Sequence, residues 1–234
     1  MRKSKTINTE DVLITLCESV SQVLTKASGN RITYSGMVQK ISRTCLRPDI
    51  GCFVLFDGGF NGIVVTNFTA TAALEVYQDY MTNMGMPDSE ISKSHLADDV
   101  ANVLGELMNQ IVGGFTYKVR EQLQTTITQS QPKMLVINKL VHISVDTVMD
   151  RPQARRVTFT TTNNNIFYLE LAMDKTEFIK LHDFEIAEEI DPDDILEATA
   201  AQAKNSEVEI TPEDDSDVDD SDVDDDDFMA SLGL

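Results

Sequence analysis

The chain has 234 residues, 39 of them acidic and 19 basic, and a formal net charge of −20. Residues 183–234 hold 21 of the acids and one base, Lys204, which leaves 18 of each sign in residues 1–182. A neutral body with a strongly acidic tail disfavours nucleic-acid binding, because the tail repels phosphate. The longest apolar runs, such as residues 134–137, are too short for a membrane span of about 20 residues, and the basic start soon turns polar, without a signal-peptide core.

The cysteines and histidines indicate neither a disulfide framework nor a metal site. There are three of each, and the histidines are isolated in the sequence. A structural zinc site needs four converging ligands, usually as close pairs, whereas Cys45 and Cys52 are seven residues apart. We therefore expect no bound metal, burial of the cysteines as small apolar groups, and a reducing cytoplasm as the simplest location.

The first half of the chain predicts a helix, three strands and a second helix. Apolar residues at helical spacing from Val12 to Leu24 predict the first helix, and Gly58 to Asn61 are typical of a hairpin turn. Gly85 and Pro87 end the second helix. The expected ranges are a helix over 8–27, strands over 31–42, 50–57 and 62–66, and a helix over 71–83.

A third and longest helix is expected from about Ser94 to Gln122. Its apolar residues form one stripe at helical spacing, namely Val100, Val103, Leu104, Leu107, Met108, Ile111, Val112 and Phe115. Gly113 and Gly114 cost a helix about 1 kcal/mol each, which indicates a kink or close packing there.

Strand patterns dominate the next part of the body. They cover 125–128, 134–139, 142–148, 157–162 and 166–173, with residues 163–165 as the turn of a last hairpin, and a short helix is expected over 175–182. The order of elements predicts an α+β domain over residues 8–182, with helices packed on a mostly antiparallel sheet.

Residues 183–234 predict an acidic tail that is largely disordered, with a short helix over 193–204. Asp215, Asp217 and Asp219 mimic part of a calcium loop, but Asp220 and Asp226 stand where that loop needs Gly and Glu, so calcium binding is disfavoured. The apolar end, residues 228–234, is either a docking peptide on an acidic leash or the incidental end of a solubilising tail.

Glu106 and Asn109 are polar residues on one face of the otherwise apolar third helix. Asn102 lies four residues before Glu106, on the same side. Taken alone, this pair is weak evidence, since a helix must show polar groups somewhere. However, residues 99–114 (DVANVLGELMNQIVGG) resemble the signature helix of the bacterial chemotaxis phosphatases CheC, CheX and FliY. Their pattern is Asp or Ser, three residues, Glu, two residues, Asn, twenty-two residues, Pro. Glu106, Asn109 and Pro132 match it, and Gly105 and Gly113 are similar to family positions.

The resemblance extends over about residues 12–178 in the order of segments, and residues 50–65 are similar to the hairpin before the signature helix of CheX. Two positions depart from the family. Asn102 stands where the pattern has Asp or Ser. The first helix, which in CheC carries a second Glu-x-x-Asn, has Glu18 and Ser21, so a single active face is implied, as in CheX.

The resemblance implies a CheC-like two-layer fold and a phosphatase acting on the aspartyl phosphate of a CheY-type response regulator. Asn109 would orient the attacking water, because a carboxamide both donates and accepts hydrogen bonds without repelling phosphate. Glu106 would anchor the partner through its phosphate-site lysine, and Asn102, Gly105 and Pro132 would support binding. No cofactor of its own is implied, because Mg²⁺ belongs to the regulator, and a homodimer with joined sheets is possible.

Two other functions stay open at this point. The first is a non-catalytic signalling or flagellar-switch protein on the same fold, with which Asn102 is compatible. The second is a nucleic-acid binder. It would have to use six bases, which are Lys118, Arg120, Lys133, Arg151, Arg155 and Arg156, and the last three of these cluster around Pro152. The acidic tail makes pairing of these bases with the tail or with partner acids the better interpretation.

Overall fold

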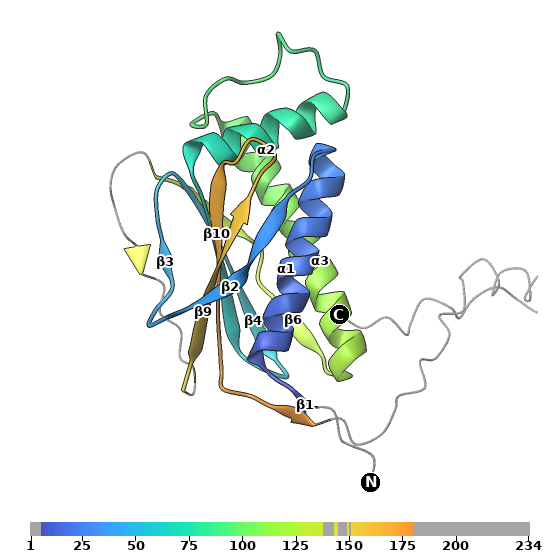
Figure 1. The fold of residues 1–234 in the computed structure, drawn as a ribbon, viewed down its shortest axis with the longest axis vertical. Helices are drawn as coiled ribbons and strands as arrows, with labels where there is room; N and C mark the ends of the chain where they lie inside the picture. Colours follow the sequence, from blue (N-terminus) through green and yellow to red (C-terminus); the bar gives the residue numbers. More distant parts are fainter. Residues whose placement is uncertain (1–5, 138–142, 145–148, 150, 180–234) are drawn as a thin grey trace, which may run out of the picture. The chain divides into compact units, whose positions relative to one another are not determined.

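The computed structural model describes residues 6–137, 143–144, 149 and 151–179 (Figure 1). Its helices are α1 (Thr9–Ser28), α2 (Ala70–Asn83) and α3 (Asp98–Leu123). Its strands are β1 (Thr6–Ile7), β2 (Thr33–Ile41), β3 (Cys45–Leu46), β4 (Ile50–Gly58), β5 (Gly62–Phe68), β6 (Ile127–Gln129), β7 (Lys133–Val136), β8 (Ile143–Ser144), β9 (Gln153–Thr160), β10 (Ile166–Met173) and β11 (Phe178–Ile179).

The main sheet has seven strands in the order β2-β9-β10-β5-β4-β6, with β7 also paired to β4, and all its pairs are antiparallel. The turn between β4 and β5 is the predicted one. Gly58 adopts a φ of +132°, and a Cβ on it would come within 2.3 Å of the Thr126 carbonyl oxygen, so the turn requires glycine. Helices and an antiparallel sheet together confirm the predicted α+β class.

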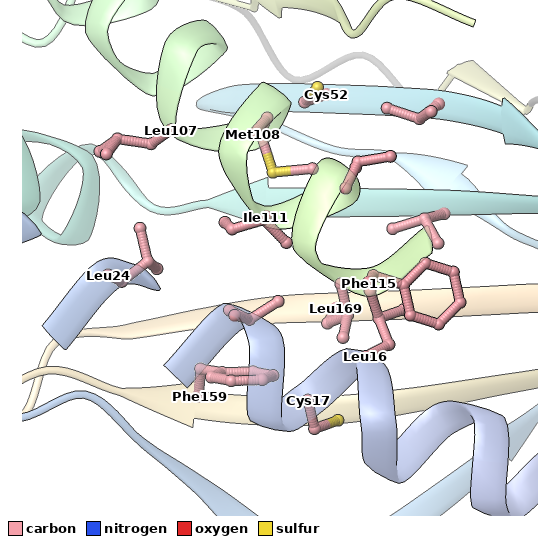
Figure 2. Close-up of a cluster of buried hydrophobic side chains, with 14 of the residues drawn as sticks. Leu16, Cys17, Leu24, Cys52, Leu107, Met108, Ile111, Phe115, Phe159 and Leu169 are labelled. Atoms are coloured by element: carbon pink, nitrogen blue, oxygen red, sulfur yellow. The ribbon is translucent and has the colours of Figure 1, made fainter. Parts of the chain in front are cut away.

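α1 and α3 lie side by side against one face of this sheet (Figure 1). Between the helices and the sheet, Leu16 of α1 and Ile111 and Phe115 of α3 meet Phe159 and Leu169 of the strands (Figure 2). All five side chains are almost fully buried. This apolar layer fixes the orientation of α3, because turning the helix would expose its stripe to water.

The prediction of a helix over residues 175–182 is wrong for residues 175–179, which are the part of this range that the structure describes. Residues Phe178 and Ile179 form β11, which pairs antiparallel with Ile7 and Thr6. The Phe178 ring packs edge-on against Phe60, with ring centroids 6.2 Å apart. This packing and the strand pairing overrode the weak local helical pattern.

Other boundaries differ from expectation by a few residues. α3 begins at Asp98 rather than at Ser94, β9 begins at Gln153 rather than at Val157, and β6 begins at Ile127 rather than at Thr125. Of the strands expected over 134–139 and 142–148, the structure describes residues 133–136 and 143–144 as strand. The predicted acidic tail from residue 183, its helix over 193–204 and its apolar end lie outside the described residues.

Within the part of the chain that the structure describes, no helix is both long enough and apolar enough to cross a membrane.

Candidate functional site

α3 separates apolar and polar residues onto two faces. The buried face consists of Val100, Leu104, Leu107, Met108, Ile111, Val112, Phe115 and Val119. This confirms the predicted stripe except for Val103, which is half-buried at its edge. The helix carries Asp98 and Asp99 in its first turn and Arg120 in its last, which complements the helix dipole.

Asn102, Glu106 and Asn109 all lie on the opposite, exposed face. Residues three and four apart in a helix are neighbours on its surface, so the three side chains share one patch, which we call the candidate face. Glu106 Oε1 accepts a hydrogen bond from Gln110 Nε2 at 3.3 Å. Among the described residues none hydrogen-bonds to the carboxamide of Asn109, so its donor and its acceptor both remain available to an incoming molecule.

Gly105 and Pro132 lie at the junction between α3 and the edge of the sheet. A Cβ on Gly105 would lie 3.3 Å from Met134 Cγ of β7, so the missing side chain lets helix and strand approach closely. Pro132 stands between β6 and β7, which pair with different parts of β4. Both residues are half-buried. Gly105 therefore lies where α3 approaches β7, and the binding role expected for both residues stays a prediction.

The first helix shows no second polar pair of this kind. Glu18 is exposed, but Ser21 Oγ donates a hydrogen bond to the Ile32 carbonyl oxygen at 2.6 Å. The side chain at position 21 is therefore committed to the protein's own backbone, which agrees with a single candidate face on α3.

The buried cysteine thiols are poor nucleophiles at neutral pH. Burial raises the pKa of the Cys17 and Cys52 thiols to about 12, so neither is a thiolate at neutral pH. Both pack in the apolar core between sheet and helices (Figure 2). Among the described residues no group of three or more His, Cys, Asp or Glu side chains is arranged to hold a metal ion.

Two of the bases considered for nucleic-acid binding are already neutralised by carboxylates. Arg155 Nη2 lies 2.7 Å from Glu10 Oε1, and Arg156 Nη2 lies 2.6 Å from Glu170 Oε1. The Glu170 side chain is fully buried and that of Arg155 is 9% exposed. These arginines hold elements of the body together and present no free cationic patch.

Sequence reasoning missed a groove beside the candidate face. It lies between the C-terminal half of α1, the end of α2 and the middle of α3, and has a volume of about 560 Å³. Gln110, the hydrogen-bond partner of Glu106, lines it, together with Gly114, Tyr117 and Lys118. Gly114 was the one signal in the sequence, because a glycine in mid-helix indicates an unusual surface.

The sequence matches a family of proteins of unknown function, DUF3334, over residues 3–234, and the chain belongs to that family. No curated protein matches the sequence.

Solved structures share the fold at low sequence identity. The chemotaxis protein CheX from Desulfovibrio desulfuricans matches with a TM-score of 0.58 and 19% identity over 70% of this chain and 99% of that one. A CheC-like superfamily protein from Shewanella sp. PV-4 matches with a TM-score of 0.58 and 17% identity over 72% and 99%. CheX from Borrelia burgdorferi, solved in a complex with CheY, BeF₃ and Mg²⁺, matches with a TM-score of 0.52 and 18% identity over 70% and 98%. The CheX-like resemblance expected from the third helix is confirmed for the fold.

Proposed function

We propose that this protein is a CheX-like phosphatase that hydrolyses the aspartyl phosphate of a CheY-type response regulator in the cytoplasm. The observation that carries the proposal is the joint exposure of Glu106 and Asn109 on one face of α3, a helix fixed by the core behind it. A visiting phosphoprotein can reach both side chains at once.

Hydrolysis of an acyl phosphate does not require a covalent intermediate with the phosphatase. Placing a water in line with the phosphorus supplies most of the acceleration, and the regulator's own Mg²⁺ neutralises charge. Asn109 holds that water by donating and accepting hydrogen bonds. A carboxylate at this position would repel the phosphoryl group. Glu106 pairs with a lysine of the regulator and thereby sets the distance between Asn109 and the phosphorus.

The Borrelia burgdorferi relative supports the choice of partner, because it was solved bound to CheY together with BeF₃ and Mg²⁺. The fold is shared, and the Glu-x-x-Asn pair stands on the helix that the signature predicts. A homodimer with joined sheets remains part of the proposal, since β2 lies at an edge of the main sheet.

The test is release of phosphate from the host's receiver domains, each charged with a small phosphodonor and mixed with the full chain. We expect at least one receiver to lose phosphate faster with the wild-type protein. Asn109→Ala should remove the acceleration while binding to that receiver changes little, and Glu106→Ala should weaken both. Glu121→Ala is the control, because Glu121 is exposed on the same helix far from Asn109. If Asn109→Ala is as fast as wild type, the mechanism is wrong.

The second candidate is an interaction protein without catalysis, for which Asn102 is the specific observation. This position carries Asp or Ser in the family pattern. In that case receivers would bind the chain, their phosphate would decay at the unassisted rate, and Asn102→Asp would not change that rate.

A further inference from the structure

The groove beside the candidate face is built from three helices. Val23 of α1, Tyr80 of α2 and Tyr117 of α3 form part of its walls, and Met84 lies where α2 ends. Asn83 Nδ2 donates a hydrogen bond to the Ala27 carbonyl oxygen at 3.0 Å, which ties the end of α2 to the end of α1. This hydrogen bond joins two of the three helices that line the groove.

Large apolar and aromatic side chains are exposed at the surface of the groove. Met84 is 68% exposed and Tyr117 is 51% exposed, although both are large side chains. Gly114 lies in the groove with no atom within 4 Å of a Cβ built on it. A mid-helix glycine costs about 1 kcal/mol relative to alanine, and no packing within the described chain requires it. Its absent side chain leaves the backbone of α3 open to close approach by another molecule.

The charge of the groove is opposite to that of the whole chain. Lys26 and Lys118 line it, and none of its described lining residues is acidic. Lys118 Nζ donates a hydrogen bond to Oε1 of Gln22, which also lines the groove, at 3.1 Å. In a chain with 39 acids and 19 bases, a carboxylate-free groove with two lysines matches a negatively charged partner.

We propose that this groove binds an acidic amphipathic helix of a partner protein. Apolar side chains on one face of that helix would enter the groove over Gly114, against Tyr80, Met84 and Tyr117. Carboxylates flanking them would pair with Lys26 and Lys118. This is the helix-in-groove form of peptide recognition. It does not depend on the phosphatase proposal, although Gln110 places the groove next to Glu106.

The test uses the full chain and a fluorescein-labelled helical peptide made of LEELLEE repeats, with an LQQLLQQ peptide of equal length as the uncharged comparison. Binding is measured by fluorescence anisotropy at about 0.15 M salt, where charges more than about 8 Å away are largely screened. We expect saturable binding of the glutamate peptide and about tenfold weaker binding of the glutamine peptide.

Two variants locate the binding on the groove. Gly114→Leu fills it with a side chain that helices favour, and Lys118→Glu reverses one charge at the surface; each should weaken binding about tenfold. Lys93→Glu is the control, since Lys93 lies outside the groove and is 61% exposed. If the glutamate peptide does not bind, or binds both groove variants as tightly as wild type, the proposal is overturned. If Gly114→Leu fails to fold by circular dichroism, Lys118→Glu alone decides.

Discussion

Asn109 and Arg155 are both polar, and their surroundings give them opposite roles. Asn109 is exposed and makes no side-chain hydrogen bond to any described residue, so it can serve an incoming molecule. Arg155 is buried and donates hydrogen bonds to Glu10 Oε1 from Nε at 3.0 Å and from Nη2 at 2.7 Å. Its ion pair with Glu10 joins β9 to the first turn of α1.

This ion pair makes stability depend on pH. The hydrogen bond from Arg155 holds the pKa of Glu10 below its ordinary value of 4.5. The folded state therefore favours the ionised carboxylate, so the stabilisation is complete well above pH 4.5 and is lost as the pH falls through the lowered pKa. Glu10→Gln should lower the free energy of unfolding by about 1 kcal/mol at neutral pH, a modest value because the Glu10 side chain is half exposed.

The measurement is urea unfolding at neutral pH and at successively more acidic pH, where the difference from wild type should shrink as the pH falls through the lowered pKa of Glu10. Glu90→Gln serves as the control at an exposed position. A Glu10→Gln deficit that stays constant across this pH range would contradict the electrostatic explanation.

At the scale of the element, α3 contains glycines for two different reasons. Gly105 sits where α3 approaches β7, and a Cβ there would lie 3.3 Å from Met134 Cγ. Gly113 faces open space, and a Cβ at this position would have no atom within 4 Å. The sequence pattern treats both as family positions, but the packing distinguishes them.

The same substitution at both positions should therefore give different results. Gly105→Val should lower the free energy of unfolding by about 1–3 kcal/mol, because the branched side chain must displace Met134 and the strand that carries it. Gly113→Val should be neutral or stabilising by less than about 1 kcal/mol, because valine is a better helix former than glycine and meets nothing. Urea unfolding of the two variants beside wild type measures this. Equal changes in the free energy of unfolding at both positions would contradict the role of packing against Met134 at Gly105.

At the scale of the whole molecule, Glu170 of β10 connects the neighbouring strand β9 with β3, which lies 125 residues earlier in the sequence. Its carboxylate accepts hydrogen bonds from Arg156 Nε at 2.8 Å and from the Cys45 backbone N–H at 3.0 Å. Leu169 and Leu171, its neighbours in β10, belong to the core under the helices, so Glu170 points to the other face of the sheet. The hydrogen bond from the Cys45 N–H to Glu170 therefore holds β3 against that face.

Glu170→Gln should be among the most damaging single changes outside the apolar core. It leaves the guanidinium of Arg156, which is 13% exposed, without its counter-charge, and a loss of about 3 kcal/mol in the free energy of unfolding is expected. Asp88→Asn is the matched control, because it breaks the exposed Asp88–Lys93 pair and should cost well under about 1 kcal/mol. Thermal and urea unfolding measure both, and similar small losses would contradict the importance of burial.

Much of the fold and the exposure of the candidate face could be predicted from periodicity. Helical spacing in α1 and α3 assigns their buried stripes, and the same spacing places Glu106 and Asn109 opposite the stripe of α3. The β11 segment could not be predicted, because Phe178 and Ile179 form a strand through Phe60 and Ile7, which are distant in the sequence. The roles assigned to Glu106, Asn109, Asn102, Gly105 and Pro132 stay predictions.

The sequence by itself determined the approximate positions of α1, α2 and α3, which sides of α1 and α3 are apolar, and that Glu106 and Asn109 share a surface. These properties follow from the chain's local geometry, in which each side chain's direction is set by its position in a regular repeat. Only the tertiary structure decided that Arg155 and Arg156 are neutralised by Glu10 and Glu170, and that three helices line a groove with two lysines beside Glu106. Ion pairs and grooves depend on distances between segments that only folding brings together.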